Sequence, residues 1–199
     1  MKRIIVLFLI ICAAVFPMSI TKAQEPIRLV TLPIIITSQA RASSDALNQM
    51  KVKIARSMHV PLNGTLKKVE YIPSSQSSPV LQDIWSRIYQ SNKKAKLKEA
   101  MKPLAEELKA DFIVCTVLYS CNEMTSMSMG FDHSTLLQSN AGVEMILFDN
   151  RKDELVSKKR SKFFNDEYSP RGTADALAIE CLTDLIEELN PRKRMLTND

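Results

Sequence analysis

Soft metal-ligand side chains gather between Cys121 and His133, with Met124, Met127 and Met129 between them. Thiolate, thioether and imidazole groups suit monovalent copper, which needs few ligands and accepts flexible ones. These five residues form the metal-binding hypothesis that the sequence offers, although their spacing matches no strict metal-binding motif.

The same segment also has a simpler interpretation. Methionines commonly fill apolar gaps or form adaptable contact surfaces. On this interpretation Met124, Met127, Met129 and Phe131 form an interaction loop that a partner contacts or that packs on the core. We favour this interpretation, keep the copper site as the alternative, and expect no cofactor.

An enzyme would need groups that this chain hardly supplies. A hydrolase usually relies on a histidine base, and only His59 and His133 are present. His59 stands beside Pro61 at the end of a predicted helix, and the four glycines form no phosphate-binding loop. The sequence therefore favours a non-enzymatic protein without catalytic residues, and a hydrolase is the most distant alternative.

Residues 1–23 have the pattern of a secretory signal peptide. Lys2 and Arg3 precede an apolar run over residues 4–16, and a more polar stretch leads to Ala23, after which we expect cleavage. The apolar run is shorter than the ~20 residues that span a bilayer. We therefore expect an exported protein, periplasmic or secreted, with no transmembrane segment after cleavage.

Signal cleavage also changes the charge of the chain. Of the 27 lysines and arginines, three lie in the signal segment, so 24 remain against 22 acidic residues. The mature chain is thus only weakly basic, and we expect no nucleic-acid partner.

Three cysteines remain after cleavage: Cys115, Cys121 and Cys181. Cys115 and Cys121 lie six residues apart on one predicted strand, roughly 20 Å, too far to form a disulfide. Either one can pair with Cys181 in an oxidising compartment, or all three are small buried thiols. The sequence leaves both possibilities open.

Residues 110–121 predict the central strand of the fold. Alternate positions are apolar on both faces, with Phe112, Val114 and Leu118 on one and Ile113, Cys115, Val117 and Tyr119 on the other. Such a strand is covered by other elements from both sides.

The elements before the central strand follow from apolar spacing and turn residues. We expect a strand over 27–36 that is irregular near Pro33, a helix capped at Ser43, a short strand over 66–72 and a helix beginning at Ser78 with Trp85 in the core. A helical segment over 92–109, divided at Pro103, carries a lysine run typical of a solvated helix face.

A hairpin and a helix follow the central strand. We expect strands over 136–149, with a bulge near Gly142, and over 155–164, and then a helix over 173–189. The second strand carries four cations between Lys158 and Lys162. They indicate either a polyanion site or a sheet edge that lysines protect from aggregation, and we favour the second.

Two stretches carry a resemblance to a known group. These are L-K-A-D-F-I-V-C-T-V, with Leu108, Ala110 and Asp111, and V-E-M-I-L-F-D-N-R-K-D-E-L-V-S-K, with Asp149 before its turn. They resemble bacterial envelope α/β domains that include the TolB amino-terminal domain and the LpoB and CsgG-type lipoproteins. The resemblance implies a mixed sheet with flanking helices and a non-enzymatic envelope role. It transfers no catalytic residue, and this chain lacks a usable lipid-acceptor cysteine.

Together these patterns predict one α/β (α+β) domain over 24–190 and a flexible basic tail over 191–199. Its sheet is mixed, mainly antiparallel and of about five strands, with flanking helices. We expect an exported binding or scaffolding module of the cell envelope. A protein partner would contact the interaction loop or add a strand to an exposed sheet edge.

Overall fold

A single mixed sheet of six strands organises the structure, a computed structural model that describes residues 25–127 and 135–197. Its strands are β1 Ile27–Thr31, β2 Ile35–Ile36, β3 Val69–Ile72, β4 Phe112–Met127, β5 Thr135–Asp149 and β6 Glu154–Glu167. The spatial order is β3-β1-β4-β5-β6, with β2 beside β4. The three long strands β4, β5 and β6 pair antiparallel, whereas β1, β2 and β3 join by parallel pairing. The predicted fold class is confirmed.

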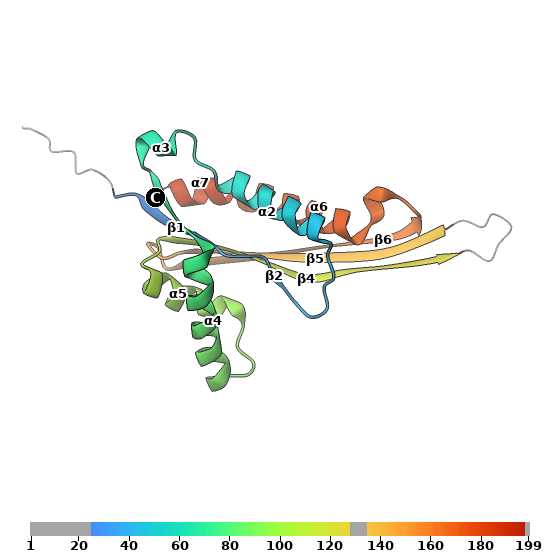
Figure 1. The fold of residues 1–199 in the computed structure, drawn as a ribbon, viewed down its shortest axis with the longest axis horizontal. Helices are drawn as coiled ribbons and strands as arrows, with labels where there is room; N and C mark the ends of the chain where they lie inside the picture. Colours follow the sequence, from blue (N-terminus) through green and yellow to red (C-terminus); the bar gives the residue numbers. More distant parts are fainter. Residues whose placement is uncertain (1–24, 128–134, 198–199) are drawn as a thin grey trace, which may run out of the picture.

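Helices lie on both faces of this sheet (Figure 1). They are α2 Ser44–Met58, α3 Asn63–Leu66, α4 Ser74–Ser91, α5 Met101–Leu108, α6 Ala174–Leu189 and α7 Pro191–Leu196, with 3-10 segments η1 Leu97–Ala100 and η2 Pro170–Gly172. One face packs on α2, α6 and α7, and we call it the α6 face. The opposite face packs on α4, η1 and α5, and we call it the α4 face. In the part of the chain that is described, no helix has the length and hydrophobicity that crossing a bilayer requires.

The first half of β4 is buried from both sides, as its sequence predicts. Phe112, Val114 and Leu118 belong to the core on the α6 face. Ile113, Cys115 and Val117 belong to the core on the α4 face, and Tyr119 packs against that core while partly exposed. β4 is therefore the strand on which the two helical layers meet.

Two helices on the α6 face, α2 and α6, begin where the sequence supplies caps. The Ser43 hydroxyl accepts a hydrogen bond from the Ala46 amide, 3.1 Å away, as expected. Thr173 caps α6 in the same way through the Ala176 amide. The carboxylate of Glu123, far along β4, accepts a hydrogen bond from the Ala174 amide at 3.0 Å, so it ties the start of α6 to the sheet.

The amino-terminal strands agree with the sequence except at one boundary. The predicted irregularity at Pro33 is the break between β1 and β2. The strand predicted over 66–72 begins only at Val69, because residues 63–66 form the short helix α3. Asn63 fixes this arrangement, since its side-chain amide pairs with both the N–H and the C=O of Val69, at 2.8 and 2.7 Å.

The elements between β3 and β4 differ more from their predictions. α4 begins at Ser74, four residues before the predicted start, so Pro79 lies inside the helix. Trp85, predicted as a core residue, is only partly buried. The segment 92–109 is not one helix, since η1 and α5 follow a non-helical stretch over 92–96, and Pro103 falls in the first turn of α5. The lysine run therefore lies mainly in a loop.

The basic tail predicted to be flexible folds instead. Pro191 to Leu196 form α7, and the side chains of Pro191 and Met195 are buried. The Arg151 guanidinium pairs with the Asp149 carboxylate at 2.6 Å and donates to the Met195 carbonyl at 3.0 Å. Charge pattern alone misled the prediction, because the tail also carries Pro191 and Met195, two apolar residues that the fold buries. Residues 1–23, the predicted signal peptide, lie outside the described residues.

Met195 tests this docking of α7. We expect Met195→Ala to lower the free energy of unfolding by about 2–5 kcal/mol, the usual cost of truncating a fully buried side chain. The matched control is Leu196→Ala on the same helix, where the side chain is more than a third exposed and the loss should be much smaller. Urea denaturation of both variants measures the difference. Equal midpoints would contradict the docking.

Candidate functional site

A cleft of about 750 Å³ opens between α4 and the α4 face of the sheet. Such a volume falls within the range of small-molecule sites. We call it the α4 cleft. Its lining comes from the β1–β2 connection and β2, from α4, from the segment 95–98, and from β4, β5 and β6. The lining residues are Pro33, Ile35, Thr37, Ser78, Leu81, Gln82, Trp85, Ala95, Lys96, Leu97, Lys98, Val117, Tyr119, Glu144, Ile146 and Lys159.

A β-bulge shapes the sheet side of the cleft. The register of β4 against β5 shifts between Leu118 and Ser120, so Tyr119 is the extra residue. The bulge predicted near Gly142 thus lies on the opposite strand, with Gly142 paired to Ser120. The Tyr119 ring lies across Gly142, where an added Cβ would stand 2.3 Å from a ring carbon. Only glycine leaves room for the ring.

The tyrosine and two charged residues form the polar end of the cleft. The Tyr119 hydroxyl donates to the Arg160 carbonyl of β6 at 3.3 Å. The Lys159 ammonium lies 5.3 Å from the Tyr119 ring centroid, a cation–π distance. The Glu144 carboxylate pairs with Lys159 at 3.3 Å and accepts from the Ser157 hydroxyl at 2.5 Å. The charge of Glu144 is therefore compensated within the sheet.

The helical side of the cleft combines Leu81, Trp85 and Leu97 with the polar Ser78 and Gln82 of α4, and it carries the only tryptophan of the chain. Leu81 and Trp85 face the cleft from α4, one helical turn apart, and Leu97 lines it from η1. The Trp85 ring lies 6.2 Å from that of Tyr89, in a tilted aromatic pair that holds its position. Trp85 therefore reports directly on whatever occupies the cleft.

Two lysines at the cleft, Lys96 and Lys98, differ from Lys159, the third lysine in its lining. Lys96 and Lys98 are contributed by the segment between α4 and α5. In the described residues no carboxylate lies within ion-pair distance of either ammonium, whereas Lys159 has Glu144. Lys96 and Lys98 thus leave a positive charge beside an apolar surface.

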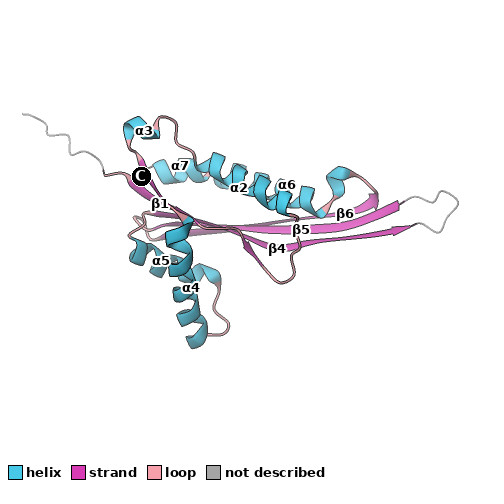
Figure 2. Cartoon of the chain, viewed as in Figure 1, coloured by secondary structure: helices cyan, strands magenta, loops and turns pink. Residues whose placement is uncertain are grey.

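A second surface lies farther along the same face, where none of the helices in residues 25–127 and 135–197 covers the strands (Figure 2). Cys121 and Glu123 point to the α6 face. Because side chains alternate along a strand, Asn122, Met124 and Ser126 of β4 point to the opposite face. Three cross-strand rows make this distal face: Asn122, Asn140 and Phe163; Met124, Gln138 and Asn165; Ser126, Leu136 and Glu167. Its large apolar side chains are unusually accessible, at 61% for Met124, 38% for Leu136 and 62% for Phe163.

The predicted interaction loop is only partly described. Met124 lies on β4 within the distal face, and Met127, 82% exposed, ends the same strand. An odd separation along the strand turns these two methionines to opposite faces. Met129 and Phe131 lie outside the described residues. Phe163 on β6 and Leu136 on β5 were missed by the sequence reasoning, although the alternation along each strand contained the signal.

The structure separates the ligands of the copper hypothesis that it describes. Cys121 is fully buried on the α6 face and its Sγ lies 3.8 Å from Asp175 Oδ1, whereas Met124 is on the opposite face. Burial and the nearby Asp175 carboxylate raise the pKa of Cys121 to about 12, which disfavours the thiolate that soft metals bind. Met129 and His133 lie outside the described residues. Among those described, no cluster of three His, Cys, Asp or Glu side chains could hold a metal ion.

The three cysteines are buried free thiols. Cys115 lies in the core of the α4 face, and Cys121 and Cys181 in that of the α6 face. Burial raises the pKa of Cys115 to about 12 and that of Cys181 to about 11. The buried-thiol alternative is therefore the one that the structure contains.

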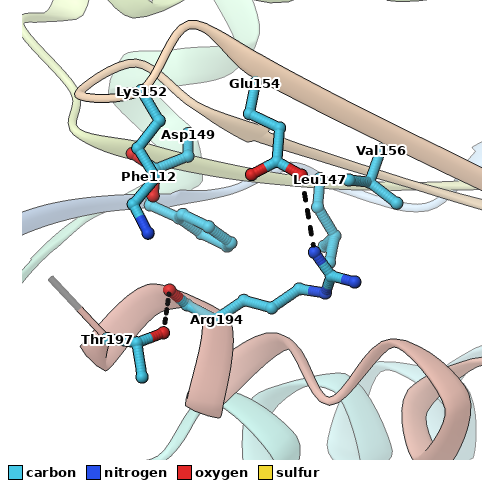
Figure 3. Close-up of a pocket in the computed structure, with 8 residues that line it drawn as sticks. All are labelled: Phe112, Leu147, Asp149, Lys152, Glu154, Val156, Arg194 and Thr197. Carbon is cyan, nitrogen blue, oxygen red and sulfur yellow. Dashed lines mark hydrogen bonds and ion pairs between the residues drawn. The ribbon is translucent and has the colours of Figure 1, made fainter. Parts of the chain in front are cut away.

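A smaller cavity, of about 90 Å³, lies where α7 meets the hairpin of β5 and β6 (Figure 3). Arg194 crosses it and pairs with Glu154 at 3.7 Å, and the Thr197 hydroxyl donates to the Arg194 carbonyl. Phe112 and Leu147 form its inner wall. This space is far below the usual volume of a ligand site. We interpret it as a packing gap under the docked tail.

The cations of β6 are engaged within the fold. Lys158 and Arg160 pair with Glu188 of α6 at 2.5 and 2.7 Å, and Lys162 pairs with Glu180 and Asp184 at 2.9 and 3.0 Å. Hydrogen bonding from Lys158 lowers the pKa of Glu188. With Lys159 held by Glu144, this strand offers no unpaired cationic row to a polyanion.

The chain matches no protein-family model and no curated protein. Solved structures with similar folds include the hypothetical protein CT253 from Chlamydia trachomatis, at 13% identity and TM-score 0.45, over 83% of this chain and 96% of that one. Lipoprotein GNA1162 from Neisseria meningitidis is 13% identical, with TM-score 0.36, over 82% and 99%. The LpoB C-terminal domain from Salmonella enterica is 11% identical, with TM-score 0.35, over 69% and 84%. Likenesses of this size say nothing of function. LpoB is one of the proteins that the sequence was predicted to resemble. The predicted resemblance to TolB and CsgG has no counterpart among these structures and stays a prediction.

Gly142 tests the construction of the cleft. We expect Gly142→Ala to destabilise the protein by about 1–3 kcal/mol, because its methyl group collides with the Tyr119 ring. Removing the ring should relieve the collision, so the same substitution should cost much less in a Tyr119→Ala background. Gly64→Ala is the control, since an added Cβ there meets nothing within 4 Å. Denaturation midpoints of the four variants give the coupling, and its absence would contradict the stacking.

The thiols provide a separate test by alkylation. With their pKa values raised to about 11 or 12, all three should resist iodoacetamide at pH 8 in the native protein. In denaturant without reductant, peptide mass spectrometry should find Cys115, Cys121 and Cys181 all modified. A single modified cysteine would instead reveal a disulfide.

Proposed function

We propose that this protein is an exported, non-enzymatic binding module of the cell envelope, which contacts a protein partner through the distal face. The observation that carries this proposal is the exposure of Met124, Leu136 and Phe163 on one sheet face that no described helix covers. Clusters of large, solvent-exposed apolar side chains are typical of interaction sites.

The composition of the distal face fits a protein surface better than a charged ligand. Its apolar residues stand among amides from Asn122, Gln138 and Asn165, and its one charged residue is Glu167. Protein interfaces combine such an apolar centre with neutral hydrogen-bonding groups. A partner would therefore present an apolar patch surrounded by amides or hydroxyls and little charge.

The rest of the proposal draws on the sequence. Export follows from the signal peptide predicted over 1–23, and the single domain over 24–190 is the part that would work outside the cytoplasm. The predicted interaction loop adjoins the distal face, because Met127 ends β4 and Thr135 begins β5. Partner contact would extend from the face onto that loop. The residues that line the α4 cleft include no histidine or cysteine, which supports a binding role.

Site-directed photo-crosslinking tests the proposal in the native envelope. A benzophenone amino acid in place of Phe163 should crosslink a discrete protein partner, whereas the same probe at Leu62, also well exposed, should not. Leu62 lies near α3, at the other end of the molecule.

Substitution then checks the chemistry of the contact. Met124→Ser with Phe163→Ser should abolish crosslinking from a probe at Leu136, while stability changes by only about 0.5 kcal/mol per site, because all these side chains are exposed. Leu62→Ser is the matched control. Crosslinks that persist in the double variant, or that form equally well from Leu62, would overturn the proposal.

A further inference from the structure

The α4 cleft has walls that suit a chain without polar groups. Leu81, Trp85 and Leu97 face it from the helical side, and Val117 and Ile146 from the sheet. The polar end, with Glu144, Lys159 and Tyr119, is satisfied by its own contacts. Most of the remaining lining therefore gains only from apolar contact.

Backbone pairing in the floor argues against a peptide as the occupant. At the cleft, β4 pairs with β2 on one side and with β5 on the other, and β5 also pairs with β6. β4 and β5 are therefore paired on both sides and have no free edge for an added strand, so a peptide lying over them would leave its own N–H and C=O groups without partners. Two turns of helix would need roughly 850–1,200 Å³, given a diameter of ~10–12 Å, more than the 750 Å³ of the cleft. A hydrocarbon chain has neither difficulty.

The charge beside these walls selects the head group of the ligand. Lys96 and Lys98 line the cleft without a carboxylate partner among the described residues, and the one acid of the lining, Glu144, is paired with Lys159. The Glu99 carboxylate of the same segment accepts a hydrogen bond from the Lys96 backbone N–H at 2.8 Å, but it forms no ion pair with either ammonium group. An anionic head group would therefore meet two ammonium groups that have no ion-pair partner among the described residues, while its chain occupies the apolar part.

We propose that the α4 cleft is a binding site for a long-chain fatty acid, with its carboxylate at Lys96 and Lys98 and its hydrocarbon chain against Trp85, Leu97 and Ile146. The proposal uses different residues from the distal face, and it stands or falls independently of the protein partner. It gives the fold a second role, as a carrier or sensor of single-chain anionic lipids.

The single tryptophan allows a direct test. The protein, purified as the cell processes it from the full chain, is titrated with 9,10-dibromostearate below its critical micelle concentration, because bromine quenches indole fluorescence only at short range. We expect saturable quenching of Trp85 with a stoichiometry of one. Butyrate should not compete, palmitate should compete, and 1-hexadecanol should compete more weakly than palmitate, because it lacks the charge.

The lysine run supplies a matched pair of variants. Lys96→Gln with Lys98→Gln should weaken binding, by roughly two- to fivefold for each lysine, which is the usual range for exposed ion pairs. Lys93→Gln with Lys94→Gln removes the same charge from the same loop, but neither residue lines the cleft, so affinity should stay unchanged. Ala95→Phe, which fills the cleft from a half-buried position, should abolish quenching while the thermal midpoint stays near that of the parent protein.

Each failure has a distinct meaning. Absence of quenching, or quenching that persists in Ala95→Phe, overturns the cleft as the site. Equal losses in the two lysine pairs, or equal competition by palmitate and 1-hexadecanol, overturn the assignment of the carboxylate. Crosslinking through Phe163 is unaffected by any of these results, so a failed lipid site and a failed partner site are distinguished.

Discussion

The first half of β4 is apolar on both faces, and this constraint shapes the whole molecule. Phe112 and Leu118 need cover from one side, and Ile113 and Cys115 need it from the other. A strand of this kind is stable only between two layers, because either face left in water would expose several large side chains. α4, η1 and α5 supply one layer, and α2, α6 and α7 supply the other.

The two layers differ in extent, and that difference creates the candidate sites. α6 continues along the sheet toward the far ends of the long strands, where Glu123 and Ser139 bond to the segment at its start. α4 and α5 cover only the other end of the sheet (Figure 1). The α4 cleft lies where the shorter layer stops, and the distal face begins beyond it. An apolar cleft and an accessible apolar face thus adjoin on one side of the molecule.

One extra residue in β4 decides what that side presents. In a regular strand Cys121 would point to the same face as Cys115, since six residues separate them. The bulge at Tyr119 reverses the alternation, so Cys121 packs under α6 while Asn122 and Met124 turn to the uncovered face. The same bulge lays the tyrosine ring over Gly142, where it closes the polar end of the cleft. A single register shift therefore links the core, the cleft and the contact surface.

Local patterns in the sequence determined the central strand, the hairpin of β5 and β6, and the Ser43 cap. Each of these rests on alternation, helical spacing or turn residues, which act between neighbours in the chain. For Cys181 these patterns left two alternatives, a disulfide or a buried thiol, and the buried thiol is the one observed. The sequence analysis also placed Met124 in a contact segment, but it assigned no contact role to Phe163 and did not predict the cleft. Only the tertiary structure decided that Met195 docks the tail. It also decided that the cations of β6 pair with α6 and Glu144, whereas Lys96 and Lys98 form no ion pair among the described residues, and that no described helix reaches the distal face. These outcomes depend on which distant segments come together and on how far each helical layer extends, and such distances across the fold are not encoded in any local stretch of residues.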